Sequence, residues 1–148
     1  MRSRTLGNIM RISRCCHTYR KKQLKQCPLN PSQHIYISYA CRFPGCSQEQ
    51  FAAAICIDKT TVAHQLNRLE EAGYIKRQVS PEDGRCRRIY PTEQSYAIYP
   101  AVHGAFEAFT EHILEGLTQE DRAELSRLTE ILYQNALHLI QEPKTGGC

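Results

Sequence analysis

The feature that most constrains the fold lies at residues 47–88, where two short helical patterns precede a hairpin pattern. Ser47 and Gln50 form an S-x-x-Q capping box, which predicts that a helix starts there. Asp58 then precedes a second helical pattern over residues 59–72, because Asp is a favoured N-cap. Apolar residues recur on one face of this second helix: Val62, Leu66 and Leu69. A short helix, a brief turn and an amphipathic helix make a helix-turn-helix.

The other face of the second helix is short, polar and cationic. A helix with such a face can enter the major groove of DNA and hydrogen-bond to base edges. The side chains predicted to contact DNA are Lys59, Thr60, Thr61, His64, Gln65 and Arg68. A solvated amphipathic helix would have the same pattern, so this helix alone leaves both interpretations open.

A hairpin pattern follows directly. Gly73 stands where helices commonly end in a left-handed residue, and residues 74–79 and 87–90 have the pattern of two strands. The segment SPEDGR between them favours a reversal through its proline and its Asp-Gly pair. Arginines lie at the tip and on its flanks: Arg85, Arg87 and Arg88. A guanidinium on a thin ribbon can enter the narrow minor groove, so the pattern as a whole predicts a winged helix.

Helical patterns flank this region on both sides. One helix is expected over residues 5–25 and another from a Ser32 cap to about residue 42. A long helix should start after a Thr92 cap and reach about residue 117, and a last one should follow the Thr118-x-x-Asp121 cap.

The predicted fold is therefore mainly α (α+β), a winged helix-turn-helix with N- and C-terminal dimerisation helices. The DNA-binding region should span residues 31–91, and the helical dimerisation region residues 1–30 and 92–141, with a disordered tail at 142–148. The terminal helices are more apolar than the winged helix needs as a cover, which favours a homodimer. Two recognition helices on a twofold axis would read a pseudo-palindromic double-stranded operator.

Charge and composition narrow the partners. The net charge of +4 is uneven: residues 1–92 carry 16 basic and 6 acidic side chains, and residues 93–148 carry 3 and 9. An excess of basic side chains over the first two-thirds of the chain is typical of a protein with a polyanion-binding surface. No apolar run approaches the roughly 18 residues of a membrane span, and the basic N-terminus lacks the apolar core of a secretion signal. We therefore expect a cytoplasmic protein with no membrane partner.

At this point the chain resembles the MarR family of winged-helix transcription regulators. The similarity rests on SQEQFAAAICIDKTTVAHQLNRLEEAGYIKRQ, the wing SPEDGRCRRIYPTEQ and the closing LTQEDRAELSRL. It implies a homodimeric repressor in which Arg85 reads the minor groove and Asp83 orients the wing. It also implies an effector site between the DNA-binding and dimerisation parts. One departure is that Cys56 stands where the family commonly has glycine.

Three kinds of effector stay open. A small, aromatic or phenolic molecule could bind near His17, Tyr36 and Tyr39. Oxidation could act instead at Cys15 or Cys16, where nearby basic groups such as Arg20 favour the reactive thiolate, although small buried cysteines are commonly inert. A metal-sensing alternative would use two histidines, His34 and His103.

Other classes of function have less support. The eight cysteines contain no CxxC pair, so neither a structural zinc site nor another resident cofactor is expected. No phosphate-binding glycine loop or nucleophile motif points to an enzyme. A protein-interaction module without DNA binding would keep the dimer helices but would not need Arg85 at the wing tip.

Overall fold

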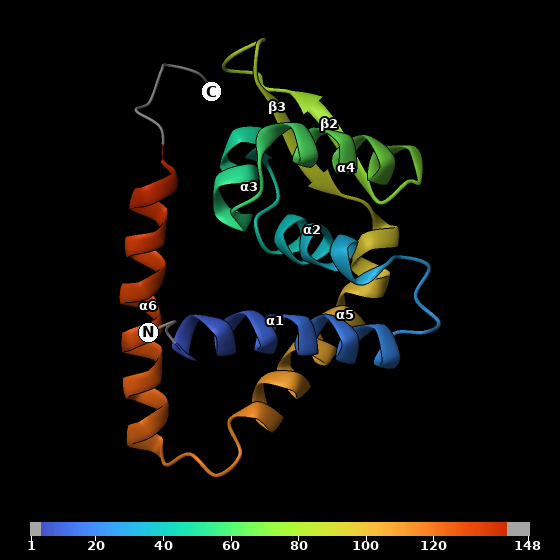
Figure 1. Cartoon of the computed structure of the whole chain (residues 1–148). Coiled ribbons are helices and arrows are strands. Elements are labelled where there is room, and N and C mark those ends of the chain that lie inside the picture. The colour runs from blue at the N-terminus through green and yellow to red at the C-terminus, as the bar shows by residue number, and fades with distance from the viewer. Residues whose placement is uncertain (1–3, 142–148) are drawn as a thin grey trace. The chain divides into compact units, whose positions relative to one another are not determined.

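The computed structural model describes residues 4–141, so the predicted tail at 142–148 lies outside the described part (Figure 1). The helices and strands are, in order, α1 (Arg4–Gln23), α2 (Pro31–Arg42), β1 (Cys46–Ser47), α3 (Gln48–Ile55), α4 (Lys59–Glu71), β2 (Ile75–Val79), β3 (Arg87–Pro91), α5 (Glu93–Ile113) and α6 (Gln119–Ile140). The chain divides between Phe109 and Thr110 into two compact units, and each is described by itself. Among the described residues, no helix is long and apolar enough to cross a membrane.

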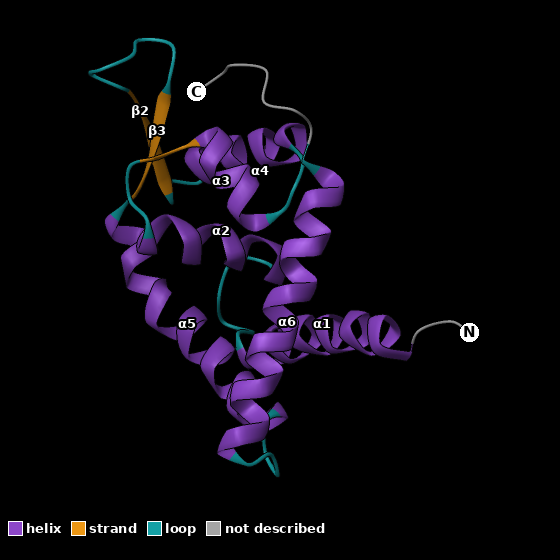
Figure 2. Cartoon of the chain, turned by 90° about the vertical axis from the view of Figure 1, so that its left-hand side faces the viewer, coloured by secondary structure: helices purple, strands orange, loops and turns teal. Residues whose placement is uncertain are grey.

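The first unit contains the predicted winged helix-turn-helix. Its sheet has the order β1-β3-β2, and both pairings are antiparallel, with Cys46 opposite Ile89 and Ile75 opposite Pro91. The sequence predicts only the two longer strands, because β1 is two residues long and has no alternating pattern. The strands β2 and β3 and the loop between them form the wing, and this loop extends beyond the neighbouring helices (Figure 2).

The core of the first unit lies between α2, α3, α4 and the sheet. The predicted apolar stripe of α4 is confirmed, since Val62, Leu66 and Leu69 are completely buried. Aromatic rings from α2 and α3 fill the next layer: Tyr36 stacks on Phe51 with ring centroids 5.6 Å apart. These contacts fix α4 in one orientation, with its other face outward.

The helix starts follow the sequence closely, with one correction. Ser47 and Gln50 form the predicted reciprocal cap of α3. The cap of α2 is Asn30 rather than Ser32: the Asn30 side chain accepts the backbone N–H of Gln33, whose own side chain accepts the N–H of Asn30. Pro31 then suits the first helical position, because its missing N–H would have no partner there.

The start of α5 is joined to the end of α4. Thr92 precedes α5 as predicted, but its hydroxyl donates to the carbonyl of Gly73 at 2.6 Å, and its N–H donates to Tyr74 O at 3.0 Å. The hydroxyl of Ser95 also donates to Tyr74 O. Gly73 has the left-handed φ of +84° predicted for it. The two helices are therefore connected by hydrogen bonds around one tight turn.

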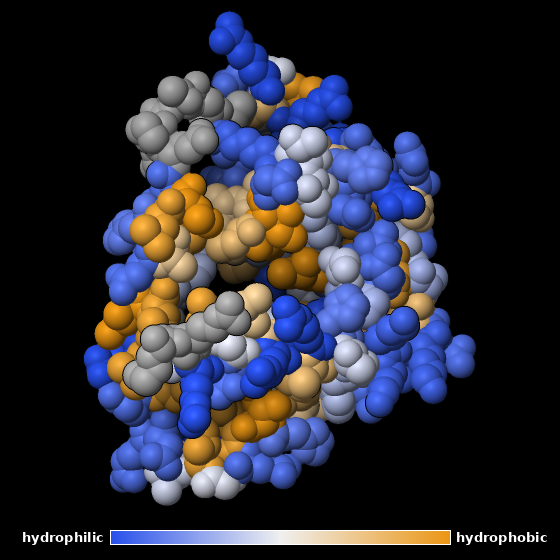
Figure 3. Space-filling view, in the orientation of Figure 1, coloured by the Kyte–Doolittle hydropathy of each residue, from blue (hydrophilic) through white to orange (hydrophobic). Residues whose placement is uncertain are grey.

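The helix α5 is continuous through Pro100 and ends at Ile113, before the predicted residue 117. In the second unit, Thr118 and Asp121 form the predicted capping box of α6. Large apolar side chains along α6 are 41–87% exposed, and hydrophobic colours recur along this helix in Figure 3. They are Leu125, Leu128, Ile131, Leu132, Tyr133, Leu139 and Ile140. In the first unit, α1 likewise exposes Leu6, Ile9, Met10 and Ile12.

Candidate nucleic-acid interface

The outward face of α4 carries the side chains predicted to contact DNA. Lys59, Thr60, Thr61, His64 and Arg68 are exposed, and Gln65 is half-buried. They share a helix whose buried stripe is on the opposite side. The sequence-predicted set is therefore presented on one surface.

The cap of α4 uses one member of this set. Asp58 accepts the backbone N–H of Thr61 at 2.8 Å and the Thr61 hydroxyl at 2.7 Å. These bonds, the side-chain bond first, lower the pKa of Asp58. Because the Thr61 hydroxyl already donates within the protein, it is left with acceptor capacity only.

The wing presents Arg85 and Arg87 to solvent. Asp83 accepts the backbone N–H of Arg85 at 3.0 Å, which fixes the direction of the chain at the tip. The loop closes through the N–H of Ser80, which donates to Cys86 O at 2.7 Å. The bond from the Arg85 N–H to the Asp83 side chain, two residues earlier, is typical of turns.

Arg88 has a different position from the predicted one. Its guanidinium donates to Gly45 O at 2.9 Å and to Ser80 Oγ at 3.4 Å, and it lies 3.6 Å from the carboxylate of Glu82. Its side chain is 34% exposed. Arg88 therefore anchors the base of the wing to the loop before β1, and we remove it from the set of expected DNA contacts.

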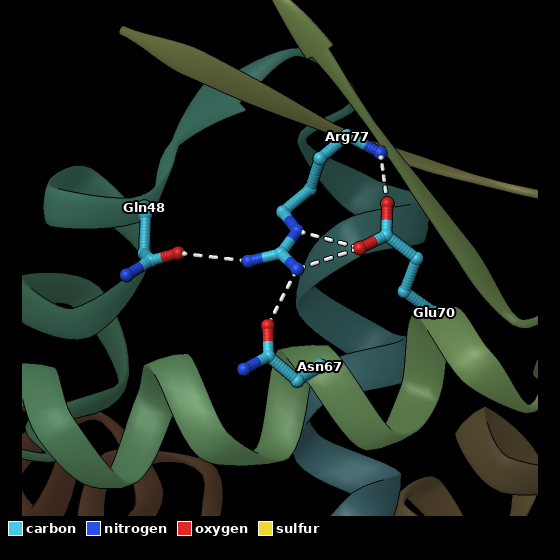
Figure 4. Close-up of polar contacts among 4 residues, drawn as sticks. All are labelled: Gln48, Asn67, Glu70 and Arg77. Atoms are coloured by element: carbon cyan, nitrogen blue, oxygen red, sulfur yellow. Dashed lines mark hydrogen bonds and ion pairs between the residues drawn. The ribbon is translucent and has the colours of Figure 1, made fainter.

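The structure adds a residue that the sequence interpretation missed. Arg77, on β2, donates to Glu70 from Nε at 2.9 Å and from Nη2 at 2.6 Å (Figure 4). It also donates to Asn67 Oδ1 at 2.5 Å and to Gln48 Oε1 at 3.5 Å. One guanidinium thus joins α3, α4 and the wing.

Glu70 is the main partner of Arg77. Its carboxylate also accepts the backbone N–H of Arg77, and the hydrogen bonds from Arg77 lower the pKa of Glu70. Opposite charges on the two sides of Gly73 were the signal that could have found this pair.

A groove of about 320 Å³ lies between the wing and the helix-turn-helix. Its lining is polar and charged, and comes from three segments of the chain: Ser47, Gln48, Glu49, Lys59, Arg85, Cys86 and Arg87. Across it, Lys59 Nζ is 3.2 Å from Glu49 Oε1. The groove therefore joins the start of α4 to the flank of the wing.

The predicted effector residues do not form one site. Tyr36 and Tyr39 pack on Phe51 as part of the hydrophobic core, whereas His17 is exposed on α1. The core position of the two tyrosines follows from their spacing on the buried face of α2. We therefore withdraw them as the lining of an effector pocket.

The other effector candidates are dispersed. Cys15 is exposed and Cys16 half-buried on α1, and both are free thiols. His34 is buried, whereas His103 is exposed. Within residues 4–141, no group of three or more His, Cys, Asp or Glu side chains could hold a metal ion.

Arg20, in the last turn of α1, is buried. Its guanidinium donates to Pro31 O at 3.1 Å and lies 4.1 Å from the ring centroid of Phe106. Burial, and secondly the charge of Arg20, lower the pKa of His34. Arg20 therefore connects α1 to α2 and α5.

Comparison with known proteins agrees with this geometry. Residues 29–87, which contain the helix-turn-helix and most of the wing, match the model of the MarR family. Over this region the chain is similar to the MarR family of transcription regulators. This family consists of regulators rather than enzymes. The chain is 28% identical over 130 residues to YybA of Bacillus subtilis (strain 168), an uncharacterized HTH-type transcriptional regulator, covering 88% of this chain and 87% of YybA.

Solved structures of transcriptional regulators share the fold of this chain. The transcriptional regulator SlyA is 29% identical and has a TM-score of 0.85, over 90% of this chain and 94% of SlyA. A MarR family regulator from Listeria monocytogenes, solved in complex with 26mer DNA, is 24% identical with a TM-score of 0.85, over 90% of this chain and 89% of that one. The observed winged helix is therefore the fold of these regulators.

Proposed function

We propose that this regulator binds a pseudo-palindromic duplex operator as a homodimer and represses transcription. In each protomer, α4 enters the major groove and Arg85 enters the neighbouring minor groove. The observation that carries the proposal is the shared exposure of the α4 polar face and the arginine-tipped wing. The same fold in a Listeria monocytogenes regulator was solved in complex with DNA, which supports DNA binding by this fold.

The test is duplex binding as a function of salt. Operator fragments would be selected from a random duplex library, and their affinity measured by fluorescence anisotropy. Arg85→Ala should weaken binding and reduce the slope of log K against log salt by about one unit, because one phosphate-region cation is lost. Lys21→Ala, which removes an exposed charge from the end of α1, is the matched control. An unchanged slope in Arg85→Ala, or absence of duplex binding by the wild type, would refute the proposal.

Sequence readout is assigned to α4. Arg68→Ala should reduce operator affinity by roughly 1–3 kcal/mol if Arg68 makes a bidentate base contact. Binding to mixed-sequence duplex should fall much less. An unchanged footprint and affinity would remove Arg68 from the readout.

Dimerisation is assigned to α1 and α6. Both helices expose several large apolar side chains in the protomer, more than isolated surface leucines would explain. Leu128→Glu, on α6, should shift the protein toward monomer in sedimentation velocity and weaken operator binding. Thr129→Glu adds the same charge at the next position and serves as the control; equal sedimentation of the two variants would argue against this face.

Release by a small anionic effector is the second part of the proposal. Arg20 Nε, His34 Nδ1 and Ser38 Oγ are buried, and have no hydrogen-bond partner within residues 4–141. Buried polar groups are normally paired, and a guanidinium favours a carboxylate. Benzoate should release operator DNA from the wild type and should lose this effect in Arg20→Met, whereas phenol should act weakly. Equal release by benzoate in both proteins would exclude Arg20 as its partner.

A further inference from the structure

The groove between the wing and the helix-turn-helix has an unusual lining. It holds three cationic side chains, Lys59, Arg85 and Arg87, and a single carboxylate, Glu49. Pockets for small organic ligands are lined mostly by apolar and aromatic groups, and this lining has no aromatic residue. The groove is therefore suited to an extended anion rather than to a small apolar molecule.

The geometry of the proposed complex identifies that anion. A duplex has one sugar-phosphate strand between its major groove and the adjacent minor groove. When α4 occupies the first groove and the tip of the wing the second, this strand must cross the space between them. The described groove is that space, since Lys59 begins α4 and Arg85 and Arg87 belong to the wing.

We infer that this groove seats the DNA backbone, and that Glu49 holds Lys59 in an ion pair that must open when phosphate enters. The inference rests on the proposed function. Glu49 then limits the affinity for DNA. Its carboxylate pairs with the Lys59 ammonium in the free protein, and it repels the phosphate in the DNA complex.

The ion pair is suited to exchange. Lys59 and Glu49 are 3.2 Å apart, and their side chains are 73% and 38% exposed. Exposed pairs of this kind contribute little to stability, so Lys59 can leave Glu49 for a phosphate at small cost. A phosphate contact carries no base information, so Glu49 should lower affinity for every duplex by the same factor.

Glu49→Gln tests this directly. It should tighten binding to a selected operator and to a mixed-sequence duplex by the same factor, roughly 3- to 30-fold at low salt, because one like charge leaves the site. The slope of log K against log salt should become steeper by about one unit. Glu49 also places a negative charge in the first turn of α3. If Glu49→Gln destabilised that helix, DNA binding would weaken, whereas the inference predicts that binding tightens.

Two further proteins complete the experiment. Glu93→Gln removes an equal charge at the opposite end of the wing's strands, at the start of α5, and should leave affinity and slope nearly unchanged. In a Lys59→Ala background, Glu49→Gln should tighten binding less than in the wild type, because there is no ammonium to release.

The outcomes separate this inference from the proposed function. Absence of duplex binding by the wild type refutes the proposed function. Normal wild-type binding with an unchanged Glu49→Gln variant overturns the inference alone. The same is true if Glu93→Gln tightens binding as much as Glu49→Gln does, or if the gain is confined to the operator.

Discussion

Replacing Arg77 by methionine should loosen the joint between the recognition helix and the wing. The substitution keeps an unbranched apolar stem and removes the guanidinium, which donates two hydrogen bonds to Glu70 and one each to Asn67 and Gln48. A hydrogen bond to a charged group contributes about 1.5–3 kcal/mol when it is shielded from water. Glu70 is 36% exposed and regains water when Arg77 is lost, so we halve that figure. The two bonds to Glu70 together then account for about 1.5–3 kcal/mol of the free energy of unfolding, and the bonds to Asn67 and Gln48 add to this loss.

The loss should depend on pH with a definite sign. The hydrogen bonds from Arg77 lower the pKa of Glu70 from its ordinary value of 4.5. This contribution is complete above the ordinary value and disappears as the pH falls through the lowered one. The difference in stability between the wild type and Arg77→Met should therefore be largest near neutral pH and should shrink in acid.

Urea unfolding at fixed protein concentration measures this difference, since the stability of the proposed homodimer would depend on concentration. Arg77→Lys keeps the charge but loses the planar guanidinium, so its free energy of unfolding should lie between those of the wild type and Arg77→Met. Operator affinity should fall in parallel, because α4 and the wing no longer share an anchor. Equal unfolding free energies of the wild type and Arg77→Met at neutral pH, or a difference that does not change with pH, would refute this reasoning.

Three further changes have definite expected outcomes. Cys56 has a left-handed backbone with φ of 55°, so Cys56→Gly should stabilise the protein by about 0.5–1 kcal/mol in urea unfolding, whereas Cys56→Ala should not. Asp58→Asn keeps one capping oxygen but loses the charge and the second acceptor, so its melting temperature should lie below that of the wild type at neutral pH. The wild type alone should then lose stability as acid protonates Asp58, whose pKa its bonds to Thr61 lower. If thiol oxidation releases DNA, peroxide should act on the wild type and fail on either Cys15→Ser or Cys16→Ser; release persisting in both would exclude these thiols.

Local signals predicted the frame of the fold. The caps at Ser47 and Asp58 were predicted correctly because a cap depends on residues only three positions apart. The burial of Val62 and Leu66 followed from helical periodicity, which is also a local property.

Contacts distant in sequence were not predictable in this way. The role of Arg88 depends on the carbonyl of Gly45, 43 residues away, which the β1–β3 pairing brings beside it. An arginine at a wing has the same sequence signal whether it faces DNA or the protein. Arg77 and Gln48 likewise meet only after the helices and the sheet have packed.

The hydrogen bonds of Thr92 and Ser95 to the turn after α4 have a mechanical consequence for operator choice. They make the recognition helix and the first turn of α5 move as one body, and the part of α5 from Glu93 to Phe109 is a rigid arm of roughly 25 Å. A tilt of about 5° at the distant end of such an arm moves the other end by roughly 2 Å, more than the tolerance of a hydrogen bond to a base. In the proposed homodimer, two such arms would fix the distance between the two recognition helices. The spacing between the half-sites should therefore be selected as strictly as the bases within them.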